Sequence, residues 1–321
     1  MEYSVLNAIG NTPLVKLSKL LGNCYGEVWV KLECLNLGGS VKSRTALGII
    51  NAAEKAGVLR KDSIVVEATS GNQGIGLAMI SAIKGYQAII FMPEIMSKER
   101  MQLIQAYGGR IIFTPKGKDI SETFHLCLDA ARKLAEENPK VFIANQFENI
   151  ANPEIHGRTT AQELIRQLPG PVDAFIAGVG TGGTLTGVGK VLKRIYPHVK
   201  VIAVEPEKAA VLSGGPVGHH LQQGIGDGFI PAVLDTGLID EVVRVKDEDA
   251  IETTKKLARM EGLLAGVSGG ANVWAAIQVA YLLGKGSRIA TLLPDTGERY
   301  LSTGLFSEKE EVMEVESCIP T

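Results

Sequence analysis

Short apolar runs rich in β-branched residues alternate with longer stretches of helical periodicity along most of the chain. In the first half, such runs predict strands at 28–32, 63–68, 87–92, 110–114 and 141–145. Helical patterns lie between them, at 45–57, 74–85, 97–109 and 121–138. A second series follows, with strands at 173–179, 200–206 and 287–295. Strands that alternate with helices in this way predict an α/β fold with open, twisted, mostly parallel sheets and helices on both faces.

The two series indicate two domains. The segment 145–157 (NQFENIANPEIHG) between them is polar and contains a proline. We therefore expect an N-terminal domain over 1–150 and a C-terminal domain over 151–321. A hydrophobic content of 45% in 321 residues is enough for a sizeable core. The acidic stretch SEKEEVMEVES, which begins at Ser307, is most simply a solvated end of the chain.

Net charge and cysteine spacing argue against several classes of binding partner and of structural site. Lys+Arg 33 against Asp+Glu 35, a formal net charge of -2, gives no basic field for nucleic acid or an anionic membrane. The cysteines lie far apart with no C-x-x-C pair, so we expect neither a disulfide framework nor a metal site. The N-terminus has no targeting pattern, and no apolar run reaches the roughly 18 residues of a membrane span. We expect a soluble, cytoplasmic protein with small-molecule partners.

The stretch GVGTGGTLTG at 178–187 lies between a predicted strand and a helical pattern. Its spacing matches G-x-G-x-x-G at Gly178, Gly180 and Gly183. Glu205 closes the next strand, where dinucleotide sites place a ribose-binding acid. Glycines that serve only a tight turn and close helix packing would give the same pattern. The loop can bind an anion in either case, because backbone N–H groups, the hydroxyls of Thr181 and Thr184, and a positive helix end converge there.

Lys42, in NLGGSVKSR, lies in the first turn of a predicted helix that begins at Val41 with Ser40 as its N-cap. The helix dipole disfavours a cation at this end, and the same field, together with desolvation, lowers the pKa of the amine. A lowered pKa makes an amine nucleophilic near neutral pH. On position alone, an exposed surface lysine is the simpler interpretation.

Two further helix starts carry polar donors. In EATSGNQGIGLA, a buried strand runs into Thr69, Ser70, Gly71, Asn72 and Gln73. This nest of donors contains no cation, so we interpret it as a carboxylate site rather than a polyphosphate site. A polar capping loop without a ligand is the alternative. Ser268, in AGVSGG, lies at another helix start, where it is either a cap or a ligand.

An activated lysine, an anion loop, a carboxylate nest and an isolated hydroxyl together describe an amino acid joined to pyridoxal phosphate. The sequence resembles the cysteine synthase family, which comprises O-acetylserine sulfhydrylases and the catalytic domains of cystathionine β-synthases. These are fold type II, tryptophan synthase β-like, pyridoxal-phosphate enzymes. The resemblance covers nearly the whole chain, through GNTPLVKL, NLGGSVKSR, EATSGNQGIGLA, MPEIMSKER, NQFENIANPEIH, GVGTGGTLTG, QGIGDGFIP, AGVSGG and GERYLST. An NAD-dependent dehydrogenase is left as a remote alternative, because it explains neither Lys42 nor Ser268.

The resemblance implies a role for each matching residue. Lys42 would form the internal Schiff base and act as acid and base at the substrate Cα. The cofactor phosphate would be bound by Gly180, Thr181, Gly182, Gly183 and Thr184. Asn72 would hydrogen-bond the 3′ oxygen of the ring, and Ser268 would face the pyridine nitrogen. The substrate carboxylate would be bound by Thr69, Ser70, Gly71, Asn72, Gln73 and Gln146.

The same resemblance implies how the domains act and how the chain assembles. The part over about 45–150 would be mobile and would close on the substrate. The first strands would pack on the other domain, which binds the phosphate. A homodimer is implied by the same analogy.

The implied reaction is a ping-pong β-replacement through an aminoacrylate. O-acetyl-L-serine would lose its α proton to Lys42 and then its leaving group, and sulfide would add to give L-cysteine. Ser268 is a neutral hydroxyl, so it cannot hold the ring nitrogen protonated as a carboxylate would. The ring is then a weaker electron sink, which favours loss of the β substituent over transamination.

Three residues depart from the family pattern. Ser43 stands where an aspartate commonly follows the lysine, and Gln73 replaces the usual threonine, although its longer amide could still donate to a carboxylate. Asp227, in QGIGDGFIP, replaces a residue that is usually small and apolar. A carboxylate there would repel hydrosulfide, yet could orient or deprotonate water, a thiol or an amine. An acid that points into solvent is the simpler interpretation.

Asp227 therefore suggests an alternative function. The chain would be an L-cysteine-consuming lyase or synthase that releases hydrogen sulfide. Water, cysteine or homocysteine would be the nucleophile, and the product would be serine, lanthionine or cystathionine.

Overall fold

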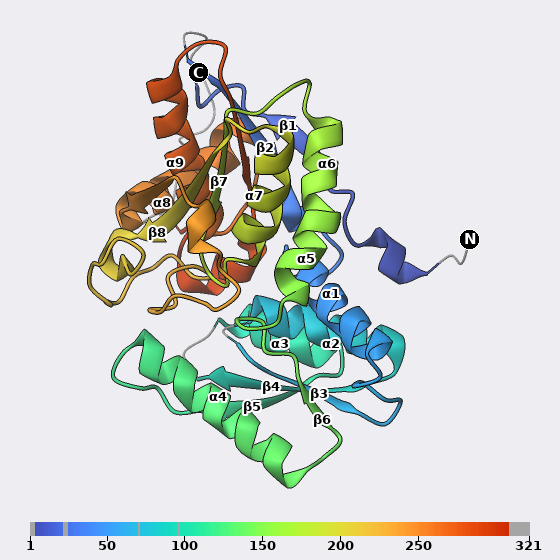
Figure 1. Ribbon diagram of the computed structural model, residues 1–321. Coiled ribbons are helices and arrows are strands. Elements are labelled where there is room, and N and C mark those ends of the chain that lie inside the picture. Colours follow the sequence, from blue (N-terminus) through green and yellow to red (C-terminus); the bar gives the residue numbers. More distant parts are fainter. Residues whose placement is uncertain (1–3, 22–24, 70, 95–96, 308–321) are drawn as a thin grey trace, which may run out of the picture.

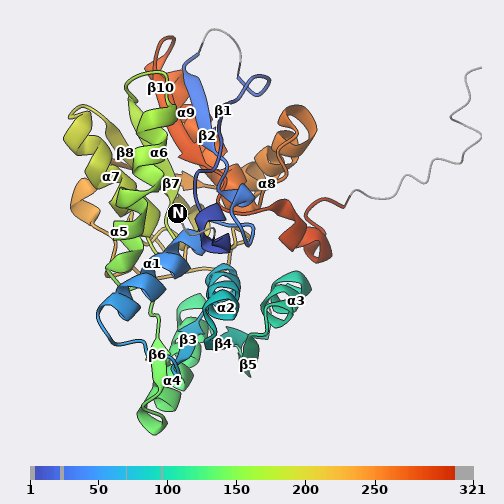
Figure 2. The ribbon, with the colours of Figure 1, turned by 90° about the vertical axis from the view of Figure 1, so that its right-hand side faces the viewer.

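The computed structural model describes residues 4–21, 25–69, 71–94 and 97–307. Two sheets form its framework, one above the other in Figure 1, and Figure 2 shows them after a quarter turn. Of the predicted acidic tail, only Ser307 belongs to the described residues. No helix in the described ranges is long and apolar enough to cross a membrane.

The larger sheet has the strand order β1-β2-β10-β7-β8-β9. β1 pairs antiparallel with β2, and all other neighbours in this sheet pair in parallel. Its strands are β1 (Leu14–Lys16), β2 (Glu27–Lys31), β7 (Ala174–Gly178), β8 (Lys200–Pro206), β9 (Glu241–Val245) and β10 (Arg288–Leu292). The two strands from the start of the chain therefore complete a sheet that is otherwise built from its second half.

The smaller sheet has the order β5-β4-β3-β6, and all of its neighbours pair in parallel. Its strands are β3 (Ile64–Ala68), β4 (Gln87–Pro93), β5 (Arg110–Thr114) and β6 (Val141–Ile143). Each of these strands lies where the apolar runs predicted one. The expected α/β fold with mostly parallel sheets is confirmed.

Helices cover both faces of each sheet. They are α1 (Lys42–Lys55), α2 (Asn72–Lys84), α3 (Lys98–Ala106), α4 (Ile120–Glu137), α5 (Ala151–Arg158), α6 (Thr160–Gln167), α7 (Gly183–Ile195), α8 (Asp247–Lys256) and α9 (Val267–Leu283). The alternation of side chains along a strand explains the two cores of each sheet. In β7, Ile176 packs in the core that contains residues of α8 and α9, whereas Phe175 packs in the core that contains residues of α6 and α7.

The sequence patterns missed some elements. The strands β1 and β9 are the two edges of the larger sheet, and each is short and partly exposed, so neither has a strong apolar run. The segment around 145–157 was expected to separate the domains, yet α5 begins inside it at Ala151. Pro153 did not prevent this helix, because it is the third residue of α5, in the first turn, where a backbone N–H has no helical acceptor.

Candidate active site

Two adjoining cavities lie where strand ends and helix starts from both sheets meet. The first cavity is lined by residues from both sheets, and its polar lining includes Lys42, Thr69, Asn72, Gln73, Gln146 and Asp227. The second cavity lies against the glycine loop between β7 and α7. Both are lined by Val41, Lys42, Thr181, Gly224, Ser268 and Pro294. Lys42 therefore lies at the junction between the two cavities.

Glycine forms the wall of the second cavity because side chains would not fit. A Cβ at Gly180 would lie 2.4 Å from the carbonyl oxygen of Gly224, and one at Gly178 would lie 2.8 Å from a methyl carbon of Ile225. Gly182 has φ +77°, which an L side chain rarely adopts. The hydroxyl-bearing residues Thr181 and Thr184 line the same space at the N-terminus of α7. Backbone donors, hydroxyls and a helix N-terminus thus surround a space suited to an anion.

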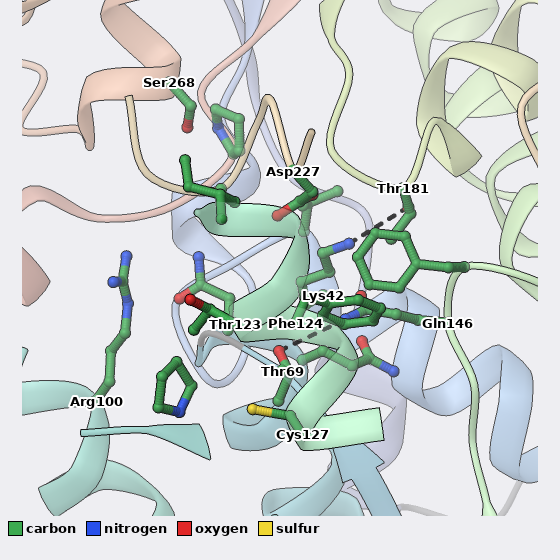
Figure 3. Close-up of a pocket in the computed structure, with 18 residues that line it drawn as sticks. Lys42, Thr69, Arg100, Thr123, Phe124, Cys127, Gln146, Thr181, Asp227 and Ser268 are labelled. Carbon is green, nitrogen blue, oxygen red and sulfur yellow. Dashed lines mark hydrogen bonds between the residues drawn. The ribbon is translucent and has the colours of Figure 1, made fainter. Parts of the chain in front are cut away.

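Lys42 is the first residue of α1, one position later than the pattern indicated, because Val41 is the residue that precedes the helix. The N-cap position is therefore Val41 rather than the predicted Ser40, although the backbone N–H of Lys42 donates to the hydroxyl of Ser40 at 3.3 Å. Its Nζ donates to Oγ1 of Thr181 at 3.5 Å (Figure 3). Burial lowers the pKa of the amine to about 8, although Asp227 and Glu67 oppose this shift. At pH 7 an amine with this pKa is uncharged in about a tenth of the molecules, far more often than an ordinary lysine.

The first cavity is lined by two buried amides that lack some or all of their hydrogen-bond partners among the described residues. Gln73 is 1% exposed, and neither Oε1 nor Nε2 of its amide has a hydrogen-bond partner among the described residues. Gln146 donates from Nε2 to Oγ1 of Thr69 at 3.5 Å, and its Oε1 has no partner within those ranges. Buried amides are normally hydrogen-bonded. These atoms therefore indicate a polar ligand at this end of the cavity.

Ser268 and Asp227 line the first cavity from the larger sheet. Ser268 is 3% exposed and lies in the first turn of α9, next to both cavities. Asp227 comes from the loop between β8 and β9, and its carboxyl is near enough to the Lys42 amine for the two charges to attract each other. Burial raises the pKa of Asp227, against the attraction of Lys42 and His220. Asp227 therefore faces the cavity, which the interpretation as a solvated acid did not predict.

Other predicted site residues lie beside the cavities rather than in their walls. Gly71 has φ +144°, and a Cβ there would lie 2.3 Å from Cδ of Arg100. Gly183 is the first residue of α7, where its N–H donates to Oγ1 of Thr181 at 3.3 Å. The hydroxyl of Ser43 donates to the backbone oxygen of Leu37, in the loop before α1. Ser70 lies outside the described residues.

Glu205 has a structural role. Its carboxyl accepts hydrogen bonds from the backbone N–H of Leu212 at 2.8 Å and of Ser213 at 3.1 Å, and from the Ser213 hydroxyl at 2.5 Å. It is 2% exposed and lines neither cavity. The acid that completed the dinucleotide pattern therefore holds the loop after β8.

Several residues of this region carried no recognised signal in the sequence. Phe124 and Phe147 pack with ring centroids 4.7 Å apart and line the first cavity together with Thr123 and Cys127. Arg100, from α3, is 2% exposed in the same wall. Aromatic and basic residues on helices have many uses, so nothing marked them beforehand.

Glu67 is a buried acid beneath the nest, and it was also missed. It is the penultimate residue of β3 and is 1% exposed. Its carboxyl accepts hydrogen bonds from the backbone N–H groups of Ala68 at 3.0 Å and Gln146 at 3.2 Å. Burial raises its pKa from 4.5 to about 8, although those two bonds and Lys42 favour the charged form. An acid inside an otherwise apolar strand, IVVEA, was the signal available in the sequence.

We expect Glu67→Gln to change how stability depends on pH. A pKa raised from 4.5 to about 8 means that the folded protein binds more protons than the unfolded chain within this window. The free energy of unfolding of the original protein therefore falls, relative to the variant, as pH rises from about 4.5 to 8. Urea unfolding at pH 5 and pH 9 measures the difference, with Glu136→Gln, an exposed glutamate of α4, as control. A difference that does not change with pH would contradict the assignment.

Comparisons with known proteins identify the family. The family model described as pyridoxal-phosphate dependent enzyme matches residues 5–295. A cysteine synthase from Staphylococcus aureus is 50% identical over 305 residues, which cover 95% of this chain and 97% of the relative.

Solved structures agree with this assignment. A hydrogen sulfide-producing enzyme from Fusobacterium nucleatum is 44% identical with a TM-score of 0.89, over 94% of this chain and 100% of the other. An O-acetylserine dependent cystathionine β-synthase from Helicobacter pylori is 36% identical with a TM-score of 0.90, over 96% and 99% of the two chains. These matches overturn the dehydrogenase alternative. The chain belongs to the pyridoxal-phosphate dependent enzymes, as a member of the cysteine synthase type.

Proposed function

We propose that the protein catalyses a β-replacement in which O-acetyl-L-serine and sulfide give L-cysteine and acetate. The observation that carries this proposal is the position of Lys42. Its amine lies between a glycine-lined cavity suited to a phosphate and a cavity with unpartnered amides suited to a carboxylate. A relative that is 50% identical is a cysteine synthase, which supports the same donor and nucleophile.

The glycine-lined cavity fits pyridoxal phosphate. The phosphate would be bound by Gly180, Thr181, Gly182, Gly183 and Thr184, through backbone N–H groups, hydroxyls and the N-terminus of α7. A Cβ at Gly178 would clash with Ile225, and one at Gly180 would clash with Gly224, so larger residues would distort the wall of this cavity. Lys42 is the only cation among the described residues that line the cavity, so its amine can bind the aldehyde carbon without competing ion pairs.

The ring would lie between Asn72 and Ser268. Asn72 would donate to the 3′ oxygen, and the hydroxyl of Ser268 would face the pyridine nitrogen. When bound, pyridoxal phosphate supplies an electron-withdrawing ring that stabilises negative charge at the substrate Cα. A neutral hydroxyl limits that withdrawal, which favours β-replacement over transamination.

The substrate carboxylate would be bound by the nest of Thr69, Ser70, Gly71, Asn72 and Gln73, together with Gln146. The amide of Gln73 supports this assignment, because its Nε2 has no hydrogen-bond partner among the described residues and can donate to a ligand. We further propose that 1–150 and 151–321 act as two domains. The part over about 45–150 would close on the carboxylate and exclude water from the cavity.

Lys42 would move the proton at the substrate Cα. Its pKa of about 8 lets the amine accept a proton near neutral pH and release it again. Departure of the β substituent before the nucleophile arrives would make the reaction ping-pong. Both half-reactions would use the first cavity, because Lys42 lines it together with the amides of Gln73 and Gln146.

The test is mass analysis of the products from matched substrate pairs. The protein is offered O-acetylserine with sulfide, O-phosphoserine with sulfide, and L-cysteine with and without homocysteine. We expect L-cysteine to form fastest from O-acetylserine and sulfide. Slower turnover of that pair than of L-cysteine alone would overturn this choice of donor and nucleophile.

Asp227 supports a second candidate function, the release of sulfide from L-cysteine with water, cysteine or homocysteine as nucleophile. Its carboxyl lines the substrate cavity beside Lys42, and burial raises its pKa. A negative charge at this position opposes entry of hydrosulfide, whereas a carboxyl with a raised pKa is a better base toward water or a thiol. A relative that is 44% identical is a hydrogen sulfide-producing enzyme, which supports this second candidate.

We expect Asp227→Ala to lower the rate of sulfide release from L-cysteine by about 10²-fold if the carboxyl acts as a general base. The same change would leave L-cysteine formation from O-acetylserine and sulfide equal or faster. Sulfide and amino-acid products are quantified for both substrate sets, with the exposed Asp129→Ala in α4 as control. An unchanged product distribution would exclude a catalytic role for Asp227.

We also propose that the protein is a cytoplasmic homodimer. The cysteines Cys34 and Cys127, the two in the described ranges, are unpaired, which fits a reducing compartment. The homodimer follows from likeness to the family. Light scattering of the purified protein measures its mass in solution.

A further inference from the structure

The side-chain amide of Asn72 has a charged partner on each side. Its Nδ2 donates to Oδ2 of Asp295 at 2.7 Å, and its Oδ1 accepts from Nη1 of Arg299 at 2.6 Å. Asp295 is 1% exposed and Arg299 is 2% exposed. Neither residue lines the cavities, whereas Asn72 lines the first one. Asp295 and Arg299 therefore contact the site only through other residues.

These two contacts select one orientation of the amide. A rotation by 180° would place the NH₂ group of Asn72 against a guanidinium and its oxygen against a carboxyl, and both pairs would be repulsive. In the observed orientation, the oxygen is occupied by Arg299, and one hydrogen of Nδ2 is occupied by Asp295. One N–H remains. Asn72 can therefore offer a hydrogen-bond donor to the cavity more readily than an acceptor.

Asp295 is itself held by several segments of the site. Its Oδ2 also accepts the hydroxyl of Tyr300 at 2.7 Å. Its backbone oxygen accepts the N–H of Gly266, two residues before Ser268, at 3.1 Å. Its backbone also forms a β-bridge with Ser40, two residues before Lys42. These contacts fix the position of Asp295 relative to the starts of α1 and α9. The hydrogen bond from Asn72 then links the start of α2 to the same two helix starts.

We propose that Asp295 is a positioning residue that, with Arg299, makes Asn72 a hydrogen-bond donor to the ring oxygen of bound pyridoxal phosphate. The proposal rests on the proposed function, because it takes Asn72 as a cofactor-binding residue. A donor at this position stabilises the ring oxygen in its deprotonated form. An amide carbonyl at the same position would instead favour the protonated oxygen, which could donate to it.

The state of the ring oxygen can be measured without any turnover. Bound cofactor with a deprotonated ring oxygen absorbs in the visible, and the form with a protonated oxygen absorbs in the near ultraviolet. We expect Asp295→Ala to shift the bound cofactor toward the near-ultraviolet band. We expect the dissociation constant of the cofactor from the apoprotein to rise about tenfold, as for other residues that orient a ligand-binding side chain.

Asp295→Asn is the matched control. Its amide oxygen can take the place of Oδ2 and accept from both Asn72 and Tyr300, so it should restore the visible band and most of the affinity. Arg299→Met removes the partner on the other side of the amide and should shift the spectrum in the same direction as Asp295→Ala. The melting temperature of each apoprotein shows whether the variant folds. If Asp295→Ala does not fold, Arg299→Met carries the spectral test.

A double-mutant cycle separates positioning from a structural role. In an Asn72→Ala background, Asp295→Ala should change neither the band ratio nor the cofactor affinity further. Equal effects of Asp295→Ala in both backgrounds, or a spectrum unchanged in the folded single variant, would overturn the proposal. An original protein that takes up no pyridoxal phosphate would contradict the proposed function instead, so the two failures are distinguishable.

Discussion

Lys42→Ala is expected to lower the rate of β-replacement by at least about 10³-fold, since both covalent attachment and proton transfer at Cα would be lost. Its amine is the only one among the described residues that line either cavity, so no neighbouring lysine can replace it. Initial rates with O-acetylserine and sulfide measure the loss. Borohydride treatment followed by intact-mass analysis should add the cofactor to the original protein and nothing to the variant.

The stability of this variant gives a second readout. Burial lowers the pKa of Lys42, so the folded apoprotein gains nothing from charging this amine at neutral pH. Removing it should leave the melting temperature of the apoprotein unchanged or raised. Lys55→Ala, at the exposed end of the same helix, should keep both activity and cofactor attachment. Activity above about a tenth of the original in Lys42→Ala would assign the proton transfer to another group.

Local patterns predicted the parallel strands because buried strands read as continuous apolar runs. Local patterns also identified the loops that the structure brings together. A glycine turn before a helix, or a lysine in the first turn of a helix, is an unusual feature that a few residues of sequence are enough to show. The edge strands β1 and β9 and the helix α5 were missed for the opposite reason. The edge strands are short and partly exposed, so they have no continuous apolar run, and α5 packs against α1 and α7 rather than showing a strong pattern of its own.

The same limit applies to the candidate site. Most of the predicted residues lie near a strand end or a helix start, where residue type indicates chemistry, whereas Asp227 lies in the long loop between β8 and β9. Glu67, Asp295 and Arg299 each contact a predicted site residue that is distant in sequence, which is Gln146 for Glu67 and Asn72 for the other two. Asp295 and Asn72, for instance, are 223 positions apart. No pattern of spacing connects them, so the contacts of the Asn72 amide with Asp295 and Arg299 could not be predicted from the sequence.

The second large effect is expected at Arg44, whose buried ion network holds the helix of Lys42. Arg44 is 1% exposed, and its guanidinium binds two carboxyls, Glu33 at 2.7 Å and Glu163 at 2.6 Å. Lys31 lies 2.7 Å from Glu163 and is fully buried. Two cations therefore balance two acids. The four residues join β2, which contains Lys31, and the segment after it, which contains Glu33, to α1 and α6.

Removing Arg44 leaves Glu33 without an ion pair among the described residues, because Lys31 pairs with Glu163. A buried charge without its partner typically costs about 3–5 kcal/mol, so Arg44→Met should lower the free energy of unfolding by that amount. Urea unfolding at pH 7 measures it. Arg44→Lys keeps the charge but cannot hold both carboxyls, so we expect an intermediate loss.

The double variant Arg44→Met with Glu33→Gln decides the cause of this loss. If an unpaired charge dominates, neutralising Glu33 should recover part of the stability that Arg44→Met removes, so the two changes would not add. A merely additive result would assign the loss to packing.

Acid stability gives an independent measure of the same network. Although burial opposes ionisation, hydrogen bonds from Arg44 and Lys31 hold the pKa of Glu163 at about 2, below its usual 4.5. A lowered pKa stabilises the fold above pH 4.5, and this contribution is lost as pH falls toward 2. Without Arg44 the pKa of Glu163 moves back toward 4.5, so the loss should begin at higher pH in Arg44→Met. Because Lys42 lies two residues from Arg44 on α1, this acid sensitivity would also set the pH at which the site loses its geometry.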